Sequence, residues 1–238
     1  MRTRRNKWTL LFVVIGMLYM FTASCKKEDA ANENNTVTDV DGNVYQTVTI
    51  GGQVWMAENL RTTKYNDSTA IPNIILASDW QKNTLGAYCL YGNVSANKDK
   101  YGVLYNFGAA ISKKLCPKGW HVPTDADWAA LNTFLGGESI AGGKLKEMGT
   151  THWTAPNTSA DNNTAFTALP GGYRASSGEF EGINNFSIYW STAYNVGDTE
   201  RATASSTVWI WIISSNTSSF YKDAYHQNYG FSVRCIKD

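Results

Sequence analysis

The 238-residue sequence has few of the side chains that carry catalysis. Histidine occurs three times, at His121, His152 and His226, and none lies in a Gly-x-Ser-x-Gly, His-Glu-x-x-His or paired-carboxylate context. The glycines of "GGESIAGGKL" have the wrong spacing for a phosphate-binding loop, and Leu145 stands where Ser or Thr would bind magnesium. We therefore predict no catalytic residue and no enzyme activity.

A hydrophobic run that would span a membrane comfortably is missing too. The run "TLLFVVIGMLYMF" is too short, follows the basic segment "MRTRRNKW" and precedes small residues and Cys25. This order is typical of a secretory signal peptide, which we place at residues 1–24. Its removal leaves 17 basic residues (21 − 4) against 20 acidic ones. Since no basic cluster then remains, we expect no nucleic-acid partner.

The small residues before Cys25 resemble a bacterial lipobox, in which the cysteine becomes the lipidated first residue of the mature protein. The alternatives are a plain signal peptide or an uncleaved anchor. Several acyl chains on Cys25 would hold the protein firmly to a membrane. Residues 25–36 are polar and lack apolar periodicity, which predicts a flexible tether. Glu28 and Asp29 resemble a Bacteroidota-type surface-export signal, so we expect export to the outer membrane, on its periplasmic side or at the cell surface.

Cysteine is scarce in the remainder of the chain. Cys89, Cys116 and Cys235 are the other three. An exported chain meets an oxidising compartment, where one disulfide would form and one cysteine would be left over. The residues alone leave all three pairings open.

Residues 37–238 show no internal repeat and no low-complexity break, which predicts one domain. Gly51-Gly52 between two β-branched runs predicts a hairpin, Asp41-Gly42 predicts a short strand before it, and residues 62–99 are expected to be irregular. Helices are predicted over 101–113, 124–135 and 140–148, and further strands over 164–174, 188–194, 207–213, 219–225 and 231–237. Strands, then helices, then strands indicate an α+β fold.

The second of these helices has the most detailed entrance, within "CPKGWHVPTDADWAAL". Pro123 fixes the chain before the helix, Thr124 is placed to cap it, and Asp127 stands in the capping-box position. We interpret His121 as a hydrogen-bonded structural residue rather than a base.

Six motifs occur along the chain in the order "KYGVLYNFGAA", "LCPKGWHVPTDADWAAL", "GGKLKE", "TAFTALPGGYR", "YWST" and "GFSVRCIKD". Together they resemble the Fibrobacter succinogenes major paralogous domain. The resemblance covers roughly residues 40–238. It implies a C-type-lectin-like fold with two main helices, a twisted antiparallel sheet and long irregular loops. It implies no particular activity, because function does not follow from fold.

The resemblance also bears on the disulfide and on cofactors. Lectin-like domains commonly tie a helix to the terminal strand, which implies a Cys116–Cys235 disulfide. The Glu-Pro-Asn and Trp-Asn-Asp calcium motifs of lectins are absent, and Asp161-Asn162-Asn163 suits a turn-rich loop better than a calcium site. The helix entrance also looks like that of formylglycine-generating proteins, but Cys235 has no nearby cysteine partner. We expect no oxidase activity and no cofactor, with calcium as the alternative.

Aromatic residues are abundant, with nine Trp and thirteen Tyr. We assign Trp55, Trp120, Trp128 and Trp190 to the core. In "TVWIWII", Trp209 and Trp211 share one face of a strand and aliphatic residues share the other. Burial on both faces is the commoner arrangement. The alternative is that the two tryptophans line a binding groove beneath the polar loop at residues 214–219.

These observations favour a lipid-anchored binding or adhesion module whose loops contact a glycan or another surface protein. A structural envelope lipoprotein without a small ligand is the second hypothesis, and an enzyme related to the formylglycine-generating proteins is the third.

Overall fold

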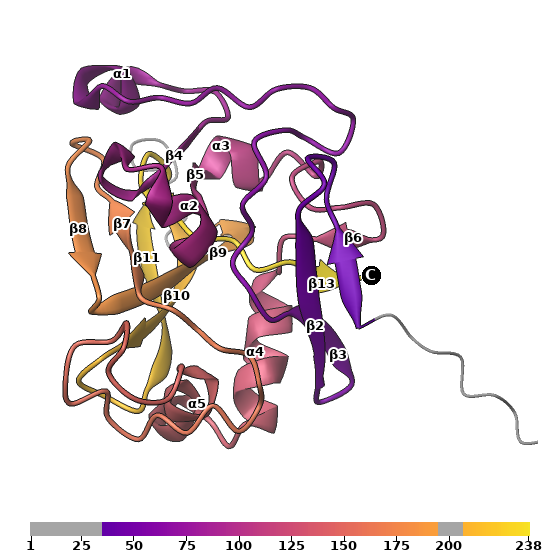
Figure 1. Ribbon diagram of the computed structural model, residues 1–238, viewed down its shortest axis with the longest axis vertical. Helices are drawn as coiled ribbons and strands as arrows, with labels where there is room; N and C mark the ends of the chain where they lie inside the picture. Colours follow the sequence, from indigo (N-terminus) through magenta and orange to yellow (C-terminus); the bar gives the residue numbers. More distant parts are fainter. Residues whose placement is uncertain (1–34, 195–206) are drawn as a thin grey trace, which may run out of the picture. The chain divides into compact units, whose positions relative to one another are not determined.

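Figure 1 shows the computed structural model of the chain, of which residues 35–194 and 207–238 are described here. The part from Asn35 to Asp238 forms one compact unit. Within the described ranges, no helix has both the length and the apolar character needed to cross a membrane. The predicted signal peptide at residues 1–24 and the predicted lipidation site Cys25 lie outside the described residues.

The first sheet contains the predicted hairpin. β2 (Val44–Ile50) and β3 (Gln53–Met56) pair antiparallel, and β1 (Thr36–Thr38) adds to the outer side of β2. Gly51 and Gly52 form the turn with φ of 60° and 83°, a region that favours glycine. The C-terminal strand β13 (Ile236–Lys237) lies between β3 and β6 (Trp120–His121), so the end of the chain is held inside this sheet.

Two further sheets complete the β structure. One has the order β4-β5-β12-β7-β8, and the other has the order β11-β10-β9. Every strand pair in the three described sheets is antiparallel. The strands are β4 (Tyr88–Cys89), β5 (Leu104–Asn106), β7 (Gly171–Arg174), β8 (Phe180–Ile183), β9 (Phe186–Tyr194), β10 (Thr207–Ser214), β11 (Phe220–His226) and β12 (Gly230–Phe231).

The helix with the predicted capping box, α4 (Asp125–Phe134), is confirmed. The Asp127 N–H donates to the Thr124 hydroxyl at 3.2 Å, and the Thr124 N–H donates to the Asp127 carboxylate at 2.8 Å. The predicted third helix is α5 (Glu138–Leu145). Shorter helical segments are α1 (Ala77–Lys82), η1 (Tyr91–Asn93), α2 (Ala96–Tyr101) and α3 (Phe107–Ala110). The fold is therefore α+β, with most of the regular structure in antiparallel sheets.

The prediction of one helix over residues 101–113 is wrong. Gly102 has φ of 80° and ends α2, Leu104–Asn106 is strand β5, and only Phe107–Ala110 is helical. Val103, Leu104 and Tyr105 are all buried. A short run that is buried on every side has no polar face, so its apolar spacing does not separate helix from strand. The predicted strands over 164–174 and 231–237 are also shorter than expected.

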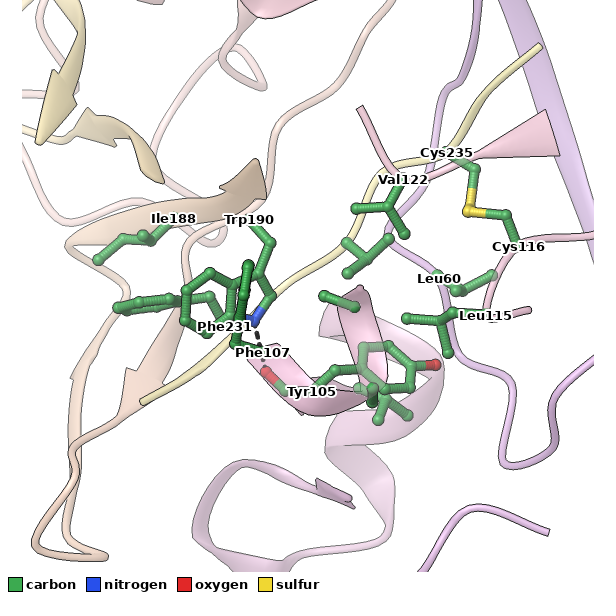
Figure 2. Close-up of a cluster of buried hydrophobic side chains, with 14 of the residues drawn as sticks. Leu60, Tyr105, Phe107, Leu115, Cys116, Val122, Ile188, Trp190, Phe231 and Cys235 are labelled. Carbon is green, nitrogen blue, oxygen red and sulfur yellow. Dashed lines mark hydrogen bonds between the residues drawn. A yellow bond between two sulfur atoms is a disulfide. The ribbon is translucent and has the colours of Figure 1, made fainter. Parts of the chain in front are cut away.

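Two hydrophobic cores lie on opposite faces of β10. Ile210 and Ile212 belong to the first core with Trp190, while Trp211 and Ile213 belong to the second. In the first core (Figure 2), the indole N–H of Trp190 donates to the Tyr105 carbonyl at 2.6 Å, and Phe231 packs edge-on against the Trp190 ring. In the second core, Trp55 and Trp128 stack with ring centroids 4.6 Å apart. The core assignment is therefore confirmed for Trp55, Trp128 and Trp190, whereas Trp120 is half-buried at the edge of the first core.

Candidate functional site

A disulfide joins the segment that leads to α4 to the residue just before the last strand, β13. Cys116 and Cys235 are bonded, with Cα atoms 6.0 Å apart, as the family resemblance implied (Figure 2). The third cysteine, Cys89, is a buried free thiol, and burial raises its pKa to about 12. Since the thiolate is the reactive form, Cys89 is a poor nucleophile at neutral pH.

The two tryptophans predicted to line a groove differ in burial. Trp211 is only 5% exposed, and its indole N–H donates to Asp125 Oδ1 at 3.1 Å. Trp209 is half-buried, and the Lys222 ammonium lies 4.2 Å from its ring centroid. Lys222 in turn forms an ion pair with Asp125 at 3.1 Å. Binding by this pair stays a prediction, but only Trp209 has appreciable accessible ring surface.

The three histidines lie in different parts of the fold. His121 Nδ1 lies 2.7 Å from Asp238 Oδ1, and its Nε2 lies 3.3 Å from Asp127 Oδ2, so the ring links the C-terminus to the start of α4. His152 contacts the Glu147 carboxylate, and His226 Nδ1 accepts an N–H from two residues further on. Across residues 35–194 and 207–238, no group of three or more His, Cys, Asp or Glu side chains could hold a metal ion.

The segment Asp161-Asn162-Asn163, which was considered for calcium, uses its side-chain oxygens in hydrogen bonds within its own loop. Asp161 Oδ1 accepts the Asn163 N–H at 3.0 Å, and the Asn162 side-chain oxygen accepts the Thr167 N–H at 2.8 Å. These bonds are typical of turn-forming Asx residues.

A group of half-buried tyrosines offers a surface that the sequence did not single out. Tyr173 comes from β7, Tyr225 from β11, and Tyr229 from the turn that leads into β12. The Tyr229 ring centroid lies 5.1 Å from that of Tyr225 and 6.1 Å from that of Tyr173. Tyr229 also stacks on Phe231, a buried residue of the first core. We call Tyr173, Tyr225 and Tyr229 the tyrosine surface; Figure 1 shows the strands β7 and β11 that carry two of them.

Polar groups accompany these rings. The Tyr173 hydroxyl donates to Glu181 Oε2 at 2.8 Å, and burial together with this bond raises the pKa of Tyr173. Burial and the nearby Asp223 carboxylate raise the pKa of Tyr225. In the described part of the chain, the hydroxyls of Tyr225 and Tyr229 have no hydrogen-bond partner. The surface thus combines apolar ring area with hydroxyl and carboxylate groups that can contact a ligand.

The tyrosine surface could have been suspected from one local signal. In "FYKDAYHQNYGF", tyrosines recur at positions 221, 225 and 229. The strand prediction covered the first two, but nothing local shows that Tyr173, more than fifty residues earlier, packs beside Tyr229. The two tyrosine rings come together only because β12 pairs with β7.

Comparison with known families is informative for most of the chain. The family model described as the Fibrobacter succinogenes major domain matches residues 48–237. The chain belongs to this family. No curated protein and no solved structure gives a significant match.

In its described residues, this Fibrobacter succinogenes major domain also contains three buried cations that bind backbone carbonyls. The first is Lys146, which follows α5. Its ammonium donates to the carbonyls of Thr158 and Thr217 at 2.8 Å and of Ser214 at 3.1 Å, and lies 5.6 Å from the Trp153 ring centroid. The loop at residues 214–219, which we expected to form a polar rim, therefore directs two carbonyls inward. Burial lowers the pKa of Lys146 to about 8.

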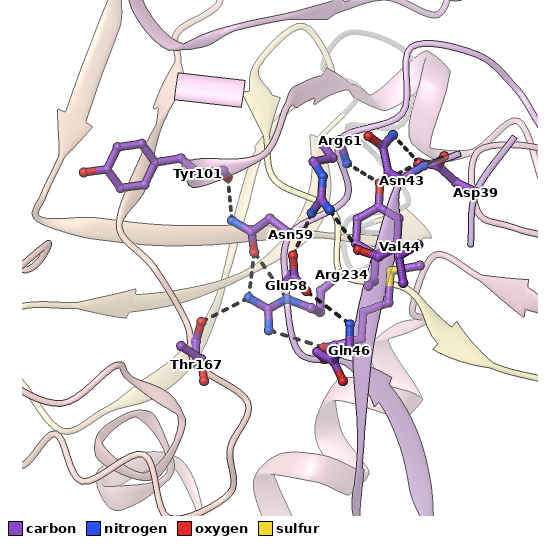
Figure 3. A network of polar contacts seen from close by, with 12 residues as sticks. Asp39, Asn43, Val44, Gln46, Glu58, Asn59, Arg61, Tyr101, Thr167 and Arg234 are labelled. Atoms are coloured by element: carbon purple, nitrogen blue, oxygen red, sulfur yellow. Dashed lines mark hydrogen bonds and ion pairs between the residues drawn. The ribbon is translucent and has the colours of Figure 1, made fainter. Parts of the chain in front are cut away.

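The second buried cation is Arg234, in the segment between β12 and β13 (Figure 3). Its guanidinium donates to Asn59 Oδ1 at 2.8 Å, to the Thr167 carbonyl at 3.4 Å and to the Phe166 carbonyl, and it lies 4.2 Å from the Phe166 ring centroid. Asn59 in turn donates to the Tyr101 carbonyl at 2.9 Å. A cavity of about 170 Å³ lies beside Arg234, but all of the Arg234 N–H groups donate within the protein.

The third is Arg174 on β7. Its guanidinium donates to the carbonyls of Ile74, Ile75 and Gly178 at 2.5–2.9 Å, and lies 4.6 Å from the Trp80 ring centroid. Within the described residues none of the three cations has a carboxylate at ion-pair distance. Most of their partners are backbone carbonyls outside the strands, so the three cations hold loops from inside the domain.

Proposed function

We propose that the chain is an exported, lipid-anchored binding module whose ligand is a glycan. The observation that carries the proposal is the tyrosine surface. Flat aromatic faces stack on the apolar C–H faces of sugar rings, and adjacent hydroxyl and carboxylate groups accept or donate hydrogen bonds to sugar hydroxyls. Rings supported from below by a core residue, as Tyr229 is by Phe231, are already ordered before a ligand binds.

A C-type-lectin-like architecture is part of this proposal. Antiparallel sheets with two principal helices, long irregular segments and a disulfide between a helix entrance and the terminal strand all support it. The Cys116–Cys235 disulfide also supports export, because such bonds persist in oxidising compartments.

The proposed anchor is Cys25, at the end of the signal-like segment. We expect a mature N-terminus that begins with an acylated Cys25. Mass spectrometry of the protein purified from membranes tests this directly, since an unmodified Cys25 or cleavage at another residue would contradict it. The remaining choice between the periplasmic and the outer face requires protease accessibility on intact cells.

A glycan array tests the binding function. The mature chain with Cys25→Ser lacks the proposed acylation site and is the form to use. We expect binding that Tyr225→Ala weakens at least tenfold. Tyr65→Ala, which truncates another half-buried tyrosine, is the matched control and should leave affinity unchanged.

Trp209 supplies a second candidate position for the same function, because it is half-buried and lies on the opposite face of β10 from Ile210 and Ile212. Loss of glycan binding in Trp209→Ala but not in Tyr225→Ala would place the binding site at Trp209 instead of at the tyrosine surface. If no glycan binds at all, the structural envelope role becomes the better hypothesis. The absence of enzyme activity stays a prediction.

A further inference from the structure

The tyrosine surface has two carboxylates that no cation of the described residues neutralises. Glu181 on β8 accepts the Tyr173 hydroxyl, and Asp223 precedes Tyr225 by two residues on the same face of β11. Neither carboxylate forms an ion pair with any residue that the structure describes. Both are exposed, so a ligand can reach them.

Three basic residues that the structure describes lie close to the tyrosines in sequence, and their side chains point elsewhere. Lys222 lies on the opposite face of β11 and pairs with Asp125. Arg174 follows Tyr173 but points to the other side of β7, where three carbonyls hold its guanidinium. His226 is also on the far face of β11, where its Nδ1 accepts an N–H from Asn228. Across residues 35–194 and 207–238, the negative charge of the surface is therefore left for a ligand to neutralise.

We propose that the tyrosine surface recognises a protonated amine carried by a sugar, that is, an amino sugar whose nitrogen is not acylated. This inference rests on the proposed glycan-binding function and names the ligand class. An ammonium group is attracted to the faces of tyrosine rings, and its N–H groups donate charge-assisted hydrogen bonds to carboxylates. The sugar ring supplies C–H faces for the remaining aromatic area.

An acylated or neutral sugar fits the same surface less well. It would cover Glu181 and Asp223 without supplying a positive charge, and burying an uncompensated carboxylate is costly. Charge complementarity therefore selects for the amine, and binding should weaken as salt screens the carboxylates.

The test compares two oligosaccharides of equal length, one of glucosamine and one of N-acetylglucosamine. Titration calorimetry on the mature chain with Cys25→Ser, at a pH where the amine is protonated, should give roughly tenfold tighter binding for the glucosamine oligomer. Glu181→Gln and Asp223→Asn should each reduce that preference several-fold. Asp161→Asn, an exposed carboxylate in the loop beside α5, is the control and should not change it.

The outcomes separate the inference from the function on which it rests. Equal binding of both oligomers, unchanged in Glu181→Gln, would overturn the amine inference and leave glycan binding in place. Binding of n-butylammonium alone, with neither oligomer bound, would overturn the glycan ligand but retain amine recognition. If neither the oligomers nor n-butylammonium bind, the amine inference is wrong.

Discussion

Lys146 shows how much one side chain does in this domain. Its ammonium is the common donor for three carbonyls that belong to two separate loops. Methionine would fill similar volume but leave those carbonyls without a donor. Since each unsatisfied buried acceptor costs about 1–3 kcal/mol, we expect Lys146→Met to lower the free energy of unfolding by about 2–5 kcal/mol.

Urea denaturation measures this loss. Lys144→Met is the matched control, because Lys144 is only half-buried and donates to a single carbonyl, that of Leu135. Equal losses in the two variants would show that the three-carbonyl contact of Lys146 contributes nothing beyond an ordinary hydrogen bond.

The same residue predicts a pH dependence. Burial lowers the pKa of Lys146 to about 8, below the value of 10.5 expected in the unfolded chain. Between these values the unfolded state binds more protons than the folded state, so the free energy of unfolding should rise with pH. The stabilisation that comes from burying Lys146 without its charge is complete at high pH. It is lost as the pH falls through 8.

Buried tyrosines act in the opposite direction at higher pH. Burial raises the pKa of Tyr105 well above its usual value of 10, so its stabilising contribution is lost as the pH rises beyond 10. Burial also raises the pKa of Cys89 from 9.0 to about 12, so Cys89 opposes Lys146 in the same way. With Cys89→Ala as the parent protein, Lys146 dominates the pH window from 8 to about 9.5. Urea denaturation across it should show a positive slope in the parent protein and a flatter one in Lys146→Met; parallel slopes would contradict the assignment.

At the scale of elements, β10 is the strand that divides the two cores. Trp211 on it is buried, and we expect Trp211→Ala to lower the free energy of unfolding by about 3–5 kcal/mol. Trp209→Ala, on the same strand and face but half-buried, should cost less than half as much. Thermal unfolding of the two variants compares them, and a nearly unchanged melting temperature in Trp211→Ala would restore its predicted place in a groove.

The sequence predicted elements well where their cause is local. The Thr124–Asp127 capping box lies within four residues, and the Gly51-Gly52 turn needs only its own backbone freedom. The prediction of one helix over residues 101–113 was wrong because distant strands set the environment of these residues. In particular, β12 pairs with β5 and buries it. The tyrosine surface was missed for the same reason, since Tyr173 and Tyr229 meet only after β7 and β12 have paired.

For the whole molecule, the Cys116–Cys235 disulfide is the main covalent constraint. It closes a loop of 119 residues, which in the chain-entropy model stabilises the fold by about 4–5 kcal/mol. We expect reduction to lower the free energy of unfolding by about 3–5 kcal/mol, measured by urea denaturation with and without reductant. Cys89→Ala should retain this response to reductant. A variant that lost the response would indicate that Cys89 takes part in the native pairing.

The three buried cations have a consequence for how the surface of this domain can change. Lys146, Arg174 and Arg234 contact the loops mainly through backbone carbonyls, which every amino acid possesses. Replacing a loop side chain therefore leaves these attachments in place, provided that the new residue accepts the same backbone angles. The buried cations fix the backbone path of each loop, while the exposed side chains of the loop can vary. One scaffold could therefore present many different recognition surfaces.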